Sequence, residues 1–343
     1  MPCYTRGMLQ RSGFERSISV VEELDPVIGR EFVRSTAVIM RDALASSGEQ
    51  MAWAGGLLNG TGAPLEFSFA TFTGDLRYTV EVGGPEAPPE TRLGRIDSLL
   101  DEFGSEGRHR EIVRRFGQVQ KGASLKWGAW LGVRHRKKDA GTSFKIYAET
   151  PPEASRAASE LVAEYLDGAP VFSGAPARLV LIGMSPGSDR CEFYFELPAP
   201  RLKLSDLDRL LAHVGLEERK DELVGLMRSF DFRGESSGAD ALPDAQYGFS
   251  YSVLPPCREP VFSIIAFAAD LAGGDGLVRR QVLLATRTRG WTLGGYASLT
   301  EPVADRFFRS TYHNMISFVA GEVPLAGLQI SVSPPPLRPD EGQ

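Results

Sequence analysis

Paired strand-like runs recur along this chain and constrain its fold more than any other feature. β-branched and aromatic residues concentrate in these runs, and most neighbouring runs are joined by short turns rich in Gly, Pro, Asp or Ser. The pattern predicts five antiparallel hairpins, formed by residues 65–72 with 76–82, 124–134 with 143–150, 177–184 with 190–197, 247–254 with 261–269, and 279–289 with 291–299.

Helical periodicity fills most of the sequence between these hairpins. Each hairpin is flanked by helix, so the chain is organised as a repeated helix–strand–strand–helix unit with an irregular period of roughly 45 to 60 residues. The expected helices cover residues 27–44, 91–116, 153–166, 204–230 and 302–319.

Ten antiparallel strands would expose two sheet edges unless they closed into a barrel. Eight strands make a barrel that its own side chains almost fill, so ten strands leave an internal chamber. We therefore predict an α+β fold, a ten-stranded antiparallel barrel of about five αββα repeats with helices outside. We expect one domain over residues 1–343, with 1–20 and 335–343 as flexible termini.

The amino-acid composition limits which binding partners and which cellular compartment we expect for this protein. A formal net charge of −6 over 343 residues argues against a nucleic-acid partner. The one basic run, residues 134–138, predicts a solvated hairpin tip, with binding of an acidic partner as the alternative. Cys3, Cys191 and Cys257 are too few and too scattered for a disulfide framework, and the longest apolar run, 261–269, is too short to span a bilayer. We expect a cytoplasmic protein without membrane contact, as a monomer or homodimer.

Charged residues interrupt strands that are otherwise apolar. Glu66 lies in the first strand of the first hairpin and Arg77 in the second. Burying a charge is costly unless it is paired or solvated, so these two residues predict a wet interior.

The same anomaly recurs in the next two hairpins. Residues two apart share one face of a strand, so Lys145 projects with Tyr147, and Arg190 projects with Glu192 and Tyr194. Cationic and phenolic donors gathered on one surface suit a diphosphate ligand. The alternative is that Lys145 and Arg190 extend to solvent at strand ends.

The segments Pro64–Ser68, Leu76–Tyr78 and Phe144–Pro151 resemble those of aromatic prenyltransferases of the dimethylallyltryptophan synthase type. That family folds as a ten-stranded barrel of αββα (ABBA) repeats, and the resemblance extends as a pattern over about residues 25–335. It implies transfer of an allylic group, dimethylallyl or geranyl, from a prenyl diphosphate to an indole or other aromatic acceptor, such as a tryptophan derivative, a cyclic peptide or an indole alkaloid.

The resemblance also implies roles for residues. Glu66 resembles the carboxylate that holds the acceptor and takes up its proton. The Arg, Lys and Tyr residues at the positions that match the family resemble its diphosphate cage, in which tyrosines also shield the allyl cation. Such a reaction needs donors facing the leaving group, aromatic surfaces facing the cation, and a base. The implied cage and shield residues are Arg77, Lys145, Tyr147, Arg190, Tyr194 and Tyr296.

The chain departs from the family pattern in two places. Glu192 puts a carboxylate where the family has a cation, and it would repel a diphosphate. In the fourth hairpin, Ser263, Ile265 and Phe267 replace the usual polar and tyrosine positions. The departures leave three possibilities: a rearranged cage using Arg287 or Arg289, a different donor, or lost activity.

Other chemistry finds little support in the sequence. No Asp-rich magnesium motif occurs, and the four histidines are isolated along the chain, so we expect no metal and no other cofactor. Trp127 is expected in the core or the chamber wall, with Trp130 on the opposite strand face. Two functions remain: an aromatic prenyltransferase, including one that modifies ribosomal peptides, or a noncatalytic barrel that binds an aromatic or isoprenoid ligand.

Overall fold

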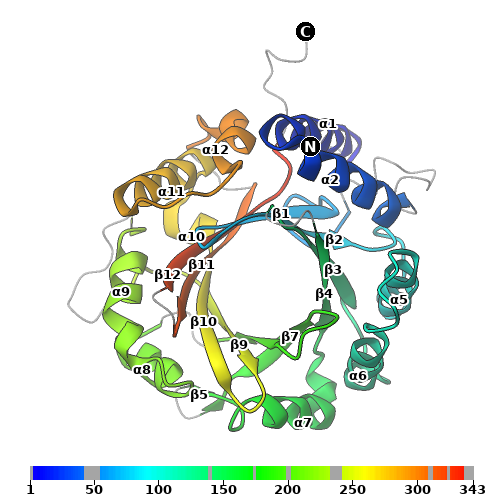
Figure 1. Cartoon of the computed structure of the whole chain (residues 1–343). Coiled ribbons are helices and arrows are strands. Elements are labelled where there is room, and N and C mark those ends of the chain that lie inside the picture. Colours follow the sequence, from blue (N-terminus) through cyan, green and yellow to red (C-terminus); the bar gives the residue numbers. More distant parts are fainter. Residues whose placement is uncertain are drawn as a thin grey trace.

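Ten strands close into one antiparallel barrel in the order β1-β12-β11-β10-β9-β8-β7-β4-β3-β2 (Figure 1). The computed structural model describes residues 3–41, 55–137, 141–172, 175–197, 202–231, 242–307, 312–322 and 325–335. The barrel strands are β1 (Leu65–Ala70), β2 (Thr73–Glu81), β3 (Ala129–His135), β4 (Thr142–Glu149), β7 (Arg178–Met184), β8 (Cys191–Glu196), β9 (Tyr247–Leu254), β10 (Arg258–Phe267), β11 (His313–Gly321) and β12 (Leu325–Val332). A separate two-stranded sheet joins β5 (Val171–Phe172) to β6 (Ala175–Pro176).

Helices surround the barrel and alternate with its hairpins along the chain (Figure 1). Within the described ranges no helix is long and apolar enough to cross a membrane. The α-helices are α1 (Cys3–Leu24), α2 (Pro26–Ile39), α5 (Arg92–Glu102), α6 (Arg110–Gln120), α7 (Ser155–Tyr165), α8 (Leu204–Ala212), α9 (Lys220–Arg228), α10 (Ala268–Ala272), α11 (Asp275–Arg289) and α12 (Tyr296–Leu299), and short 3-10 turns are η1 (Pro89–Thr91), η2 (Pro152–Ala154), η3 (Glu217–Arg219) and η4 (Glu301–Val303).

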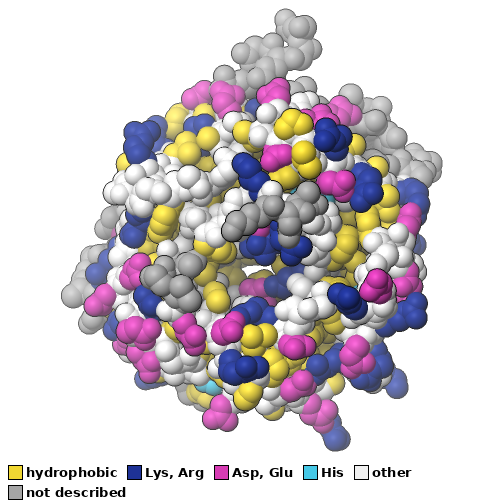
Figure 2. Space-filling model, in the orientation of Figure 1, with side chains coloured by type: hydrophobic (Ala, Val, Ile, Leu, Met, Phe, Trp, Pro, Cys, Tyr) yellow, Lys and Arg dark blue, Asp and Glu magenta, His cyan; other side chains and the backbone are white. Residues whose placement is uncertain are grey.

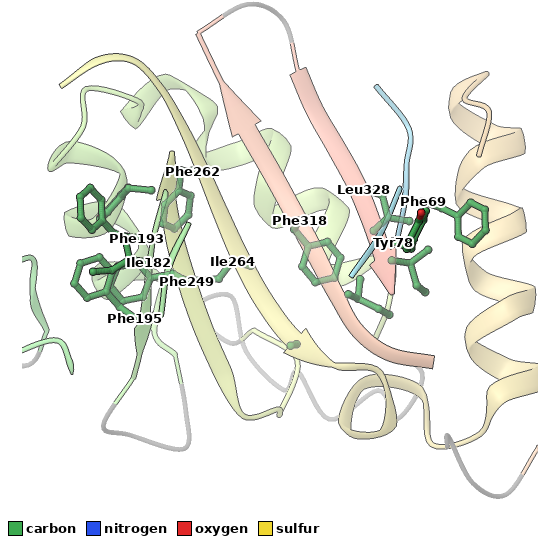
Figure 3. Close-up of a cluster of buried hydrophobic side chains, with 14 of the residues drawn as sticks. Phe69, Tyr78, Ile182, Phe193, Phe195, Phe249, Phe262, Ile264, Phe318 and Leu328 are labelled. Carbon is green, nitrogen blue, oxygen red and sulfur yellow. The ribbon is translucent and has the colours of Figure 1, made fainter. Parts of the chain in front are cut away.

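Burial alternates along the strands and separates the two faces of the barrel wall. Outward side chains such as Phe67, Phe193 and Phe318 are completely buried beneath the helices. Figure 3 shows part of this apolar layer, including Phe249 and Phe262. The intervening inward positions remain partly exposed in β1, β4 and β8. The core therefore lies between barrel and helices, which leaves the inner face free for polar chemistry.

The structure confirms the barrel and four of the predicted hairpins, but the fifth hairpin is wrong. Residues 279–289 belong to helix α11, whose buried Val278, Val282 and Ala285 follow a helical spacing. The last hairpin is β11–β12, and β11 begins inside the stretch 302–319 that we expected to be a helix. The fully buried side chains of Ile316, Phe318 and Ala320 recur there at every second residue, which is the period of a strand.

The flexibility of residues 1–20 stays a prediction, and the structure describes this N-terminal segment from Cys3 onward. It is helical from Cys3, and α1 contacts the fold through buried Phe14, Val20 and Val21. The Arg16 side chain donates to the carbonyl of Leu299 at 3.1 Å, which ties α1 to α12. Of the expected C-terminal tail, residues 336–343 lie outside the described residues.

Candidate active site

The barrel mouth is hollowed, and Lys, Arg, Asp and Glu side chains gather at its edge and inside it (Figure 2). These polar residues come from alternate positions on consecutive strands, whose other face is buried. The predicted residues on this inner face are Glu66, Arg77, Lys145, Tyr147, Glu192 and Tyr194, all of them partly buried.

Glu66 is a carboxyl group held by neutral donors. Asn314 Nδ2 donates to Glu66 Oε2 at 2.7 Å. Burial raises the pKa of Glu66 to about 7, although hydrogen bonds from Asn314 and Ser331 oppose the rise. A carboxyl that gains and loses its proton near neutral pH can serve as a base at the pH of a cell.

Arg77 lies one strand away on β2, paired in register with Ser68 of β1 and Arg134 of β3. Its guanidinium sits 5.7 Å from the ring centre of Phe72, and its buried Nε has no hydrogen-bond partner among the described residues. Burial and then the nearby Arg134 lower the pKa of Arg77. Arg134 is itself satisfied, since its Nε donates to Asp75 Oδ2 at 2.6 Å. Arg77 is therefore a cation available to an anionic ligand.

Lys145 and Glu192 form an ion pair inside the chamber. Their side chains are 25% and 18% exposed, and Ser250 donates to the second oxygen of Glu192 at 3.2 Å. Lys145 also lies 5.1 Å from the ring centre of Tyr147, which meets Tyr194 edge to face at 6.2 Å. The structure thus brings together the four predicted residues Lys145, Tyr147, Glu192 and Tyr194. Glu192, which the sequence predicts to repel a ligand, neutralises the charge of Lys145.

Two glycines on the strands beside β4 make room for this cluster. A Cβ at Gly183 would lie 2.6 Å from Lys145 Cε, and one at Gly132 would lie 2.9 Å from Tyr147 Cε2. Both distances are too short for a real side chain, so Lys145 and Tyr147 can lie across the barrel wall only because these positions lack a Cβ.

Arg190 lies at the barrel rim, immediately before β8. Its guanidinium donates to Glu259 Oε2 at 2.9 Å and to the carbonyls of Glu259 and Ser252 at 2.9 and 3.0 Å. Arg190 therefore braces the β9–β10 turn, and the prediction that it belongs to a diphosphate cage stays untested.

Three predicted cage residues lie outside the barrel, because the hairpin assigned to them is helical. Tyr296 on α12 is fully buried, and its hydroxyl is 2.9 Å from His313 Nε2. Arg287 and Arg289 are exposed near the end of α11, and Arg289 stacks over Trp291 at 5.1 Å. The rearranged cage that would use these two arginines is excluded by their position.

Trp127 and Trp130 stack at 3.8 Å with their rings 14° apart, so the prediction that they occupy opposite faces is wrong. Gly128, with φ of +72°, breaks the chain's strand geometry between them, and β3 begins only at Ala129. Trp130 pairs across strands with Tyr147, which places aromatic surface beside the cluster. Phe267, at the end of β10, is 40% exposed.

Sequence reasoning missed Asn314, Ser331, Ser250 and the two glycines. Asn314 and Ser331 lie on strands β11 and β12, whereas the sequence pattern predicts a helix over most of β11 and no element over β12. Glycines flanking Lys145 and Tyr147 in a cross-strand register would have been a signal, but only once the pairing of strands was known. The part of the chain that the structure describes contains no cluster of three or more His, Cys, Asp or Glu side chains able to hold a metal ion.

Solved structures share this architecture over nearly the whole chain. No protein-family model matches the sequence, and no curated protein matches it significantly. A 6-dimethylallyl tryptophan synthase superposes with a TM-score of 0.70 at 16% identity, covering 98% of both chains. The prenyltransferase PriB in its apo form gives a TM-score of 0.69 at 16% identity, covering 97% of this chain and 99% of PriB.

A third structure is the 6-dimethylallyltryptophan synthase from Micromonospora olivasterospora, in complex with DMASPP and Trp. It gives a TM-score of 0.68 at 18% identity and covers 96% of each chain. These likenesses show that the chain has the fold of the aromatic prenyltransferase barrels. They confirm the architecture that the sequence resemblance implied.

Proposed function

We propose that this protein is an aromatic prenyltransferase that moves an allylic group from a prenyl diphosphate to an indole or related aromatic acceptor. The main support is the placement of Glu66 and Arg77 on adjacent strands of one chamber, each without an opposite charge paired to it among the described residues. A base and an anion-binding cation are the two groups that the reaction requires at its two ends.

The proposed reaction breaks one bond and forms another. The C–O bond between the allylic carbon and the diphosphate breaks, and the diphosphate leaves with the electron pair. The allylic carbon then bonds to a carbon of the aromatic ring, and the proton displaced from the acceptor passes to Glu66. Arg77 faces the departing negative charge, whereas Tyr147, Tyr194 and Trp130 offer ring surfaces for the allylic cation.

The comparisons support a tryptophan-like acceptor and a dimethylallyl donor. Solved structures with the same fold are described as dimethylallyltryptophan synthases, and one holds DMASPP and Trp. For this chain we propose the same two classes of ligand, with dimethylallyl or geranyl diphosphate as donor. A cyclic or ribosomal peptide remains a further acceptor class, and we propose a monomer or homodimer that needs no metal.

The test is direct. The purified protein is incubated with dimethylallyl or geranyl diphosphate and a panel of tryptophan, indoles and tryptophan-containing cyclic peptides, with Mg²⁺ or with EDTA. Mass spectrometry should detect a prenyl mass gain in both conditions, and Glu66→Gln should reduce the rate by about a hundredfold or more. Full activity of Glu66→Gln would remove the base from the proposal, and activity only with Mg²⁺ would refute metal independence.

A noncatalytic barrel is the second candidate, and the Lys145–Glu192 pair favours it because the pair leaves fewer free cations for a diphosphate. Such a protein would bind an aromatic or isoprenoid ligand without transferring it. No mass gain with any donor and acceptor, together with saturable binding of an indole measured by calorimetry, would favour this candidate.

A further inference from the structure

The Lys145–Glu192 pair crosses a strand that separates its two residues. Lys145 belongs to β4 and Glu192 to β8, and β7 lies between them in the barrel. In register, Gly183 of β7 stands beside Tyr147 on one side and Glu192 on the other. Because a Cβ at Gly183 would meet Lys145 at 2.6 Å, the missing side chain is what lets the two charges meet.

Both members of the pair are held in their charged forms. Burial opposes the charge of Glu192, but Lys145 and the hydrogen bonds from Lys145, Tyr194 and Ser250 lower the pKa of Glu192 below its usual range. Burial likewise opposes the charge of Lys145, and Glu192 outweighs it and raises the pKa of Lys145. The carboxylate of Glu192 is therefore in direct contact with the Lys145 ammonium group.

Two other cations at this end of the chamber have acidic partners as well. Arg134 is paired with Asp75, and Arg190 is paired with Glu259. Arg77, in contrast, forms no ion pair among the described residues, although Asp75 and Glu192 attract it at longer range. An anionic ligand that reaches Lys145 must share it with Glu192.

We propose that Glu192 lowers the affinity of the chamber for the donor, because its carboxylate competes with a diphosphate group for Lys145. The inference rests on the proposed function, because it concerns how tightly the prenyl diphosphate donor binds at that site. A unit negative charge about 5 Å from the ligand, at an effective dielectric constant near 20, weakens binding by roughly a hundredfold. Removing that charge without changing the shape of the side chain should therefore improve binding.

The test measures the affinity of inorganic diphosphate by isothermal titration calorimetry for the wild-type protein and for Glu192→Gln. We expect Glu192→Gln to bind diphosphate ten- to a hundredfold more tightly at pH 7. Structural damage would weaken binding, so a gain in affinity reports the charge itself. The matched control is Glu196→Gln, on the same strand and face but about 13 Å further along it, which should change the affinity less than twofold.

Lys145→Met supplies the complementary measurement. It leaves Glu192 without its cation, so diphosphate binding should fall at least tenfold below that of the wild-type protein. Unchanged or weaker binding by a cooperatively folded Glu192→Gln variant would overturn the proposal, and so would an equal gain in Glu196→Gln.

The two proposals fail in different ways. If the wild-type protein transfers a prenyl group but Glu192→Gln binds diphosphate no better, the role of Glu192 is wrong and the prenyltransferase stands. If Glu192→Gln gains affinity but no donor and acceptor give a product, the competition stands and the transferase is wrong. If neither protein binds diphosphate at millimolar concentration, the role of Glu192 is overturned.

Discussion

Glu66→Gln should make the protein more stable at alkaline pH while it removes the proposed base. Burial raises the pKa of Glu66 from 4.5 to about 7, so the folded protein binds this proton more tightly than the unfolded chain does. The stabilisation from the bound proton is complete below about pH 4.5 and is lost as the pH rises through 7. Each pKa unit corresponds to about 1.4 kcal/mol, so the ionised carboxylate costs roughly 3 kcal/mol at pH 8.

The amide in Glu66→Gln carries no charge at any pH. The free energy of unfolding of the variant, relative to that of the wild-type protein, should therefore rise by roughly 3 kcal/mol between pH 4.5 and pH 8. Urea denaturation followed by circular dichroism at a series of pH values measures this difference. A difference that stays constant with pH would refute the argument that Glu66 is buried as a titrating group near neutrality.

Glu192→Gln is a matched control with the opposite sign. The Lys145 partner holds the pKa of Glu192 below 4.5, so its contribution to stability is present above that pH and is lost as the pH falls through the lowered value. Replacing Glu192 should consequently destabilise the protein at pH 7, whereas replacing Glu66 should stabilise it. The two carboxyls line one chamber, and only their different partners distinguish them.

Gly128→Ala should lower the free energy of unfolding by at least about 2 kcal/mol in denaturant titrations, because its Cβ would lie 2.0 Å from a proline carbonyl oxygen and its φ is +72°. Gly122→Ala, with φ of +73° but open space around it, should cost only about 1 kcal/mol, and equal losses would contradict the steric argument. Asn314→Ala removes a hydrogen bond that lowers the pKa of Glu66, so the acidic limb of the kcat/KM profile should move up by about one pH unit; an unmoved limb would exclude Asn314 as a positioning residue. Burial raises the pKa of the Cys191 thiol, so it should resist a maleimide reagent at pH 8 until the protein is unfolded, and labelling of the folded protein at Cys191, located by peptide mass spectrometry, would contradict this.

Local patterns in the sequence predicted much of the barrel and the inner face of its first strands. The alternation around Glu66, Arg77 and Lys145 fixes which side chains share a face, because a strand has a period of two whatever it pairs with. The prediction of the fifth hairpin is wrong because the local pattern there does not distinguish a strand from a helix. Short apolar runs near Val282 and Ile316 fit either period over a few residues, and packing against the rest of the fold decides between them.

Partners from distant parts of the chain could not be predicted in this way. Asn314 reaches Glu66 across 248 residues of sequence, through the pairing of β12 with both β1 and β11. Glu192 was interpreted from the sequence as a repulsive charge, because its distance from Lys145 depends on the order of strands β4, β7 and β8. Alternation gives the face of a residue, whereas the neighbours on that face follow from register and topology.

The pairing of charges in the chamber explains why Glu66 and Arg77 stand apart. Lys145, Arg134 and Arg190 each have a carboxylate partner, which offsets the cost of withdrawing them from water. Glu66 has neutral hydrogen-bond partners instead, and Arg77 has an aromatic ring. Glu66 and Arg77 lie on adjacent strands, and no described side chain forms an ion pair with either of them, although Asp75 and Glu192 attract Arg77 at longer range. An acceptor that gives a proton to Glu66 and an anion that pairs with Arg77 would use both groups together. An aromatic acceptor and a diphosphate ester have that combination of groups.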